Sequence, residues 1–174
     1  MSTESAQYET ESGHYRVEER AAQPYAYVSD DSVYMDRFDV IADRFGEVFA
    51  WLGQRGIEPV GPVFFKYNVI NMPGPMHLEA GVPIAEPVEG DAEVSAGELP
   101  AGRYVTVRHH GHPDSLMQAT GDLLAWAEGE GLEFDQEDTP EGHSWVSRTE
   151  WYYSDPVEVP DLNDWETELA LKLR

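Results

Sequence analysis

An internal repeat is the feature that most constrains how this chain can fold. The segment FAWLGQRGIE, which begins at Phe49, aligns without gaps with LAWAEGEGLE, which begins at Leu124. The segment YAYV from Tyr25 aligns in the same way with YVTV from Tyr104. In the first alignment, four positions carry the same residue in both halves: Ala50/Ala125, Trp51/Trp126, Gly56/Gly131 and Glu58/Glu133. Self-similarity of this kind indicates a duplicated structural unit.

The periodic patterns of the two halves also follow one order, which is strand, helix, strand, strand. Apolar residues spaced by three and four predict one helix in each half, and alternating or continuous apolar runs predict strands on either side. A further short strand, YRVEE, begins the first half at Tyr15. The predicted helices are 36–54 and 113–129, and the predicted strands of the two units are 24–30, 61–70 and 76–84, then 102–110, 143–155 and 166–173.

The repeat leads to an α+β fold made of tandem duplicated βαββ units. One such unit cannot cover both faces of its own sheet, so two units should pack about a pseudo-twofold axis. We expect two antiparallel sheets and two long helices around a central ligand cleft, because interfaces of this kind favour ligand sites. The expected organisation is a flexible acidic tail (1–14) and a single domain (15–174), divided into repeat 1 (about 15–84), linker (85–101) and repeat 2 (about 102–174).

Charge and composition exclude several classes of function. The chain has 34 acidic and 11 basic residues, a formal net charge of −23, and such a field repels the phosphates of nucleic acids. It would attract cationic ligands, although an acidic surface also serves solubility in a salt-rich cytoplasm. No apolar run reaches the length of a membrane span, and the first residues lack a signal core, so we expect a cytoplasmic protein without membrane contact. The absence of cysteine excludes disulfides and thiolate chemistry.

The stretch EWYY at 150–153 places a carboxylate among aromatic residues on a predicted strand. Because side chains alternate along a strand, Glu150 and Tyr152 share one face. A carboxylate facing a cleft lined by rings should have a raised pKa unless a cation pairs with it. The pair can therefore hold a cationic ligand or act as a general acid or base beside a hydroxyl group, and the sequence does not choose between the two. In the repeat, Tyr67 corresponds to Tyr152 and Glu79 corresponds to Glu168.

Other candidate groups carry weaker signals. His109, His110 and His112 resemble a metal cluster, but the first two point to opposite faces of a strand, and the spacing suggests no further ligand. Trp51 and Trp126 occupy equivalent helical positions, where they form either core or the floor of the cleft. The sequence contains no phosphate-binding loop, G-x-S-x-G elbow or helical His-Glu pair. We expect neither a metal nor a cofactor.

The sequence resembles the GyrI-like small-molecule-binding domain family, whose members include effector domains of multidrug-sensing transcription regulators. The resemblance rests on four stretches: GPVFFKYNVI with HLEAGVPI, the segment from LPAGRYVTVRHH to GEGLE, EWYYSDP, and the terminal DWETELALKL. The most specific element is Glu-x-Tyr-x-x-Asp-Pro. It consists of Glu150, Tyr152, Asp155 and Pro156.

The resemblance implies a stand-alone binder of apolar, in some members cationic, small molecules. Glu150 would be the charge anchor and Tyr67, Tyr152 and Trp126 would be walls of the cleft. An alternative implied by the family is a hydrolase of strained, cyclopropane-containing toxins, with Glu150 and Tyr152 as catalytic residues. A second alternative is a gyrase-inhibitor-like interaction module with a separate protein partner. The residues before Tyr15 are too few for a helix-turn-helix, so we expect that the chain is not a transcription regulator by itself, although it could work with a separate partner.

Overall fold

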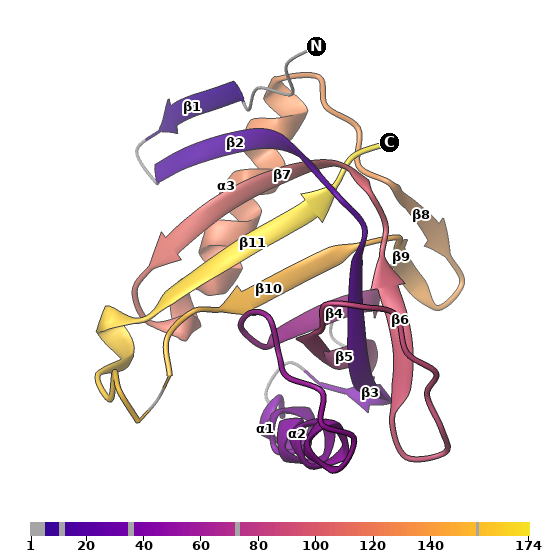
Figure 1. Cartoon of the computed structure of the whole chain (residues 1–174). Coiled ribbons are helices and arrows are strands. Elements are labelled where there is room, and N and C mark those ends of the chain that lie inside the picture. The colour runs from indigo at the N-terminus through magenta and orange to yellow at the C-terminus, as the bar shows by residue number, and fades with distance from the viewer. Residues whose placement is uncertain (1–5, 11–12, 35–36, 72–73, 156) are drawn as a thin grey trace.

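The backbone is organised around one curled antiparallel sheet, which a computed structural model describes for residues 6–10, 13–34, 37–71, 74–155 and 157–174 (Figure 1). The order of strands along the sheet is β1-β2-β7-β11-β10-β4-β5-β3-β6, with β9 paired to both β4 and β8. The strands are β1 (Ala6–Thr10), β2 (Gly13–Arg20), β3 (Gln23–Val33), β4 (Phe64–Ile70), β5 (Met76–Pro83), β6 (Ser95–Leu99), β7 (Gly102–His110), β8 (Gln136–Thr139), β9 (Gly142–Trp145), β10 (Arg148–Tyr152) and β11 (Glu166–Lys172).

The expectation of two separate sheets is wrong. Each half leaves the backbone groups along one edge of its second main strand, β4 or β10, without a partner inside that half. These two edges pair with each other in an antiparallel ladder, in which Thr149 lies opposite Lys66 and Trp151 lies opposite Phe64. Since exposed N–H and C=O groups at a sheet edge readily form such ladders, the halves join into one sheet.

The helices are shorter than expected. The predicted helix 36–54 consists of α1 (Asp39–Ala42) and α2 (Phe45–Gln54), separated by a turn at Asp43 and Arg44, and its expected first residue, Asp36, lies outside the described residues. The predicted helix 113–129 consists of the 3-10 turn η1 (Pro113–Ser115) and α3 (Leu116–Gly129), and a second 3-10 turn, η2, spans Leu162–Asp164. Among the described residues, no helix combines the length and apolar character that crossing a membrane requires.

The strands of the two halves pair in the same order, which is β3-β5-β4 in the first half and β7-β11-β10 in the second. The register agrees with the alignment of Glu79 on Glu168. Glu79 lies opposite Lys66 and Ser29, and Glu168 lies opposite the residues aligned with these two, Trp151 and Arg108. The hairpin β8–β9 has no counterpart among the described strands of the first half.

One cross-strand pair marks the centre of this arrangement. When Tyr67 is aligned on Tyr152, Phe65 is aligned on Glu150, and these last two residues are partners in the β4–β10 ladder. The aligned positions therefore face each other at the middle of the sheet. One position carries a ring and the other a carboxylate.

Three short strands lie in segments where no strand was expected. Part of the expected flexible tail, residues 6–10, forms β1, which pairs with β2, while residues 1–5 and 11–12 lie outside the described residues. The segment read as a linker contains β6, which pairs with β3 at the far edge of the sheet. The segment between α3 and β9 in the second half contains β8, which pairs with β9.

The two faces of the sheet carry different cores. On the face with the helices, α1 and α2 contact β3 and β5, and α3 contacts β7, around buried residues such as Ile41, Leu78 and Leu123. A smaller cluster that includes Tyr25, Phe64 and Trp151 covers the opposite face. The apolar face of each helix thus closes one half of the sheet and leaves the middle strands, β4 and β10, between them (Figure 1).

Candidate ligand-binding site

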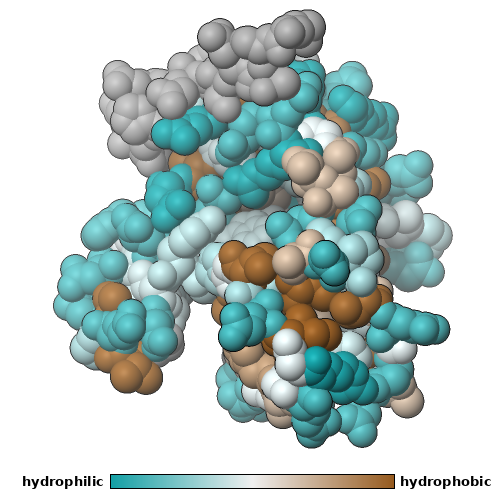
Figure 2. Space-filling model, in the orientation of Figure 1, coloured by the Kyte–Doolittle hydropathy of each residue, from teal (hydrophilic) through white to brown (hydrophobic). Residues whose placement is uncertain are grey.

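A cavity of about 500 Å³ opens between the two halves, on the helix-bearing face of β10. Its apolar walls come from both halves: Phe38, Ile70 and Met76 from the first, Leu116, Met117 and Leu124 from the second. Figure 2 shows a mostly hydrophilic surface that is hollowed between the part carrying η2 and the part carrying α1 and α2, below β10 in this view. The polar wall is formed mainly by Tyr67, Arg148, Glu150 and Tyr152.

Glu150 is the centre of the polar wall. The hydroxyl of Tyr67 donates to its Oε1 at 2.8 Å, and the hydroxyl of Tyr152 donates to the same oxygen at 2.9 Å. Within the described residues, no hydrogen bond or ion pair reaches Oε2. Although Oε2 lacks a partner, it is not fully buried and keeps some exposed surface. One carboxylate oxygen is therefore saturated, and the other is open to the cavity.

Burial controls the ionisation of this group. It raises the pKa of Glu150 above its ordinary value, against the opposing effects of the two hydroxyl donors and of the positive charge of Arg148. The pKa of the Tyr67 hydroxyl and that of the Tyr152 hydroxyl are raised well above the usual value, first by burial and then by the nearby carboxylate. Both tyrosines therefore stay protonated at neutral pH and can only donate or accept hydrogen bonds.

Aromatic rings hold these side chains in place. The ring of Phe38 lies 6.0 Å from that of Tyr67 and 5.8 Å from that of Phe65, measured between ring centroids. Phe65 meets Tyr152 edge to face at 5.5 Å. Such offset and edge-to-face contacts fix the ring orientations, and with them the two hydroxyl groups that point at Glu150.

Three of the four predicted site residues therefore lie together, and one does not. Glu150, Tyr152 and Tyr67 share the cavity, although they lie on two strands from different halves. Trp126 does not line the cavity; its ring stacks on Tyr15 of β2 with centroids 4.9 Å apart. The equivalent helical position in the first half, Trp51, donates its indole N–H to Asp91 at 2.9 Å. Both tryptophans thus join a helix to another element.

Arg148 is a cavity residue that the sequence analysis missed. It precedes Glu150 by two positions on β10 and so lies on the same face, which means that strand alternation was a sufficient signal. Its guanidinium carbon lies 4.8 Å from the ring centroid of Trp145 and 5.7 Å from that of Tyr67. The polar wall therefore carries opposite charges side by side.

The three histidines near the end of β7 do not line the cavity, and each makes a local contact. His109 Nε2 is 2.8 Å from the hydroxyl oxygen of Ser115, and His112 Nδ1 accepts a hydrogen bond from the backbone N–H of Asp114 at 3.0 Å. His110 Nδ1 lies 3.6 Å from Glu166. No group of three or more His, Asp or Glu side chains in the described part of the chain is arranged to hold a metal ion.

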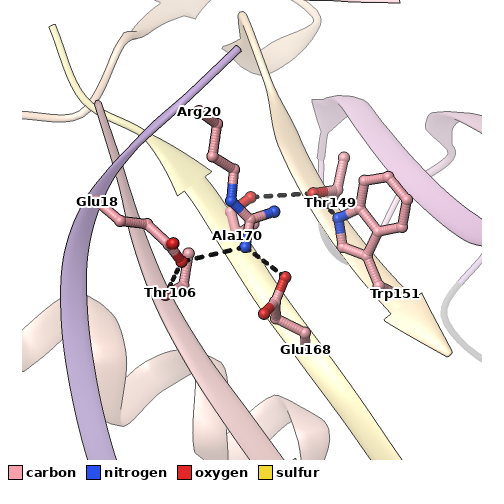
Figure 3. A network of polar contacts seen from close by, with 7 residues as sticks. All are labelled: Glu18, Arg20, Thr106, Thr149, Trp151, Glu168 and Ala170. Carbon is pink, nitrogen blue, oxygen red and sulfur yellow. Dashed lines mark hydrogen bonds and ion pairs between the residues drawn. The ribbon is translucent and has the colours of Figure 1, made fainter. Parts of the chain in front are cut away.

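A separate polar network occupies the opposite face of the sheet (Figure 3). Arg20 of β2 reaches across β7 and donates to Glu168 of β11 at 2.6 Å and to Glu18 at 3.2 Å. The hydroxyl of Thr106 donates to the same oxygen of Glu18 at 2.9 Å. This network ties β2 to the strands of the second half without contributing to the cavity.

Comparison with solved structures shows the fold. The chain is 18% identical to EcmrR in the cryo-EM structure of the EcmrR–DNA complex, with a TM-score of 0.72. The match covers 92% of this chain and 57% of the EcmrR chain. It therefore spans little more than half the length of that EcmrR chain. The crystal structure of the EcmrR C-terminal domain matches with 19% identity, a TM-score of 0.71 and coverage of 92% and 96%.

Two further solved structures have the same fold at lower similarity. SAV2435 bound to tetraphenylphosphonium matches with 11% identity, a TM-score of 0.54 and coverage of 92% and 93%. A hydrolase from Listeria innocua matches with 13% identity, a TM-score of 0.61 and coverage of 92% and 91%. No curated protein matches the chain in sequence.

The family assignment comes from the sequence profile of a protein family. The profile of the GyrI-like small molecule binding domain matches residues 14–174, which is nearly the whole chain. The fold of the EcmrR C-terminal domain agrees with this match. The chain belongs to the GyrI-like small molecule binding domain family.

Proposed function

We propose that this protein binds a largely apolar small molecule in the cavity between its halves, and that Glu150 accepts a hydrogen bond from a neutral or cationic donor of that ligand. The observation that carries the proposal is the state of the two carboxylate oxygens: Tyr67 and Tyr152 both donate to Oε1, while Oε2 has no partner in the described chain. An acceptor that is open, fixed in place and surrounded by apolar walls favours a ligand that brings its own donor.

A cationic donor fits this acceptor for an electrostatic reason. Burial disfavours the ionised form of Glu150, and a bound cation would restore it. The rings of Phe38, Tyr67 and Tyr152 would add contact with the apolar part of the ligand. SAV2435 has been solved with tetraphenylphosphonium bound to it, a lipophilic cation without an N–H or O–H group, which supports a cationic charge on the ligand of this chain but not the hydrogen bond to Glu150.

The test compares two probes of one shape, 2-naphthylmethylammonium and neutral 2-naphthylmethanol, by titration calorimetry. A charge-assisted hydrogen bond contributes about 1.5–3 kcal/mol. Glu150→Gln should therefore weaken binding of the ammonium probe by roughly ten- to a hundredfold and that of the alcohol far less. Glu137→Gln, on the exposed surface of β8, removes the same charge outside the cavity and is the matched control. Equal losses in the two variants would refute the role of Glu150.

A second candidate function is hydrolysis of a strained electrophile, and one observation favours it. A carboxyl with a raised pKa lies 2.9 Å from a tyrosine hydroxyl in a cavity large enough for a drug-sized molecule. In this reaction Glu150 would take a proton from the attacking water as the water oxygen bonds to the strained carbon. Tyr152 would turn from Glu150 and donate to the ligand oxygen that receives the electrons of the broken bond. Product analysis after incubation with a cyclopropane-containing electrophile decides the matter: a Glu150→Gln variant that binds without turnover supports the enzyme, and unchanged substrate with wild-type protein rejects it.

A further inference from the structure

Arg148 is the one arginine among the described residues that line the Glu150 cavity, and its guanidinium group has no polar partner in this part of the chain. Within the described residues, no hydrogen bond reaches it and no carboxylate lies within ion-pair distance. The nearest carboxylate on the same face, Glu150, is occupied at Oε1 by the two tyrosine hydroxyls. Apart from the ring faces of Trp145 and Tyr67, at 4.8 and 5.7 Å, no direct contact within the described residues offsets the charge of the Arg148 guanidinium.

Arg148 also borders a second hollow, of about 230 Å³, which Tyr152 does not line. Three residues, Ile70, Leu124 and Arg148, line both this hollow and the Glu150 cavity, so the guanidinium lies where the two meet. Trp145 lines the second hollow with only 8% of its surface exposed, and its indole N–H is buried without an acceptor. The ring of Trp145 thus contacts the guanidinium at this junction.

The surroundings of Arg148 offer its charge little compensation. A guanidinium offers five N–H donors, and holding it in a largely apolar site without an acceptor is unfavourable. Burial indeed lowers the pKa of Arg148 from its ordinary value, with the nearby tyrosine and Glu150 only partly opposing it. The unpartnered nitrogens of Arg148 are not among the fully buried polar atoms, so a ligand inside the cavity can reach them.

We propose that Arg148 forms a second polar subsite, which binds a carboxylate group of the ligand. The inference rests on the proposed ligand-binding function of the same cavity, and it narrows the ligand class to amphoteric molecules: an apolar body with a donor for Glu150 and a carboxylate for Arg148. A planar carboxylate matches the fork of a guanidinium in a two-bond contact. A more highly charged anion such as a phosphate is disfavoured by the net charge of −23.

The experiment compares 2-naphthoate, its neutral isostere 2-naphthamide, and 2-naphthylmethylammonium by calorimetry with the full chain at about 0.15 M salt, where long-range repulsion is screened. For wild-type protein, 2-naphthoate should bind about tenfold or more tightly than 2-naphthamide. Arg148→Gln should remove this preference and leave the affinity for the amide within about twofold. Arg103→Gln, exposed on β7, makes the same change in charge outside the cavity and should keep the preference.

Two further variants keep the test independent of folding defects, which thermal melts would reveal. Arg148→Lys retains the charge without the fork and should lose part of the preference for the acid. Glu150→Gln should leave 2-naphthoate bound equally or more tightly, because it removes a neighbouring negative charge.

The outcomes separate this inference from the proposed function. If 2-naphthylmethylammonium binds in a Glu150-dependent way but acid and amide bind equally, the Arg148 subsite is refuted and the proposed function stands. If the acid depends on Arg148 while the ammonium probe is indifferent to Glu150, the subsite stands and the role of Glu150 is refuted. Equal effects of Arg148→Gln and Arg103→Gln on the acid would also overturn the subsite, and absence of binding by all three probes overturns both proposals.

Discussion

Substitution of Arg20 by glutamine should destabilise the protein, although the residue lies on the face opposite to the cavity. Arg20 is held between two carboxylates, 2.6 Å from Glu168 and 3.2 Å from Glu18, and joins β2 to β11 across β7 (Figure 3). The arginine side chain is 27% exposed and that of Glu168 is 14% exposed, so the contact is only partly screened by water. Removal of the cation leaves the two carboxylates near each other without compensation.

The magnitude follows from these contacts. A hydrogen bond between charged groups contributes about 1.5–3 kcal/mol, and exposed ion pairs contribute about 0–1 kcal/mol. With one short, mostly buried bond and one longer, more exposed bond, we expect a loss of about 2 kcal/mol in the free energy of unfolding. In a chain of this size, 1 kcal/mol shifts the melting temperature by about 2–4 °C, so the shift should be about 4–8 °C.

Denaturant titration and thermal melts measure the effect, and the chain offers a matched control. Arg37 pairs with Asp39 at 3.3 Å, but both side chains are 62% exposed. Arg37→Gln changes the net charge by the same amount and should alter the free energy of unfolding by less than about 0.5 kcal/mol. Equal changes in melting temperature for Arg20→Gln and Arg37→Gln would refute the reasoning, since burial and geometry would then not distinguish the two arginines.

Three other predictions concern charge and packing. Because the pKa of Glu150 is raised in the folded state, the free energy of unfolding falls as the pH rises from about 4 through that pKa. In thermal melts across this range, Glu150→Gln should match wild type in acid and become more stable than wild type toward neutral pH, and a constant difference at all pH values would contradict this. Trp126→Ala should destabilise the fold through lost stacking on Tyr15, by about 3 kcal/mol, yet leave the affinity for 2-naphthylmethylammonium unchanged in calorimetry; a large loss of affinity in the folded variant would return Trp126 to the site. The melting temperature should rise with potassium chloride, since a net charge of −23 repels itself at low ionic strength, and a flat series of melts would count against this effect.

The sequence allowed the face of β10 to be predicted because alternation depends only on the chain's local geometry. Glu150 and Tyr152 lie together for that reason, and Arg148 follows from the same rule. Tyr67 was identified through the repeat and not through any local pattern. Trp126 was misplaced because helical periodicity defines an apolar face without saying which neighbour covers it, and here the neighbour is Tyr15 of an additional strand.

The sequence patterns do not predict that the two halves join into one sheet. Whether two edge strands pair depends on tertiary packing, and neither the sequence of β4 nor that of β10 indicates that the other is its partner. The same applies to β1, β6 and β8, which are short and polar and owe their strand conformation to a partner. Propensity is weak for such segments, and context determines their structure.

The pair formed by Phe65 and Glu150 has a consequence for how a single acidic centre can exist in a molecule with two similar halves. An assembly of two identical chains would place the same residue on both sides of its axis, so a glutamate there would face a second glutamate across the ladder. Two carboxylates at that spacing repel each other and share protons. A chain that contains both halves escapes this constraint, because each half can mutate alone. In this chain the first half supplies the ring of Phe65 and the second half supplies the carboxyl of Glu150, so the centre of the sheet has one acidic group and not two.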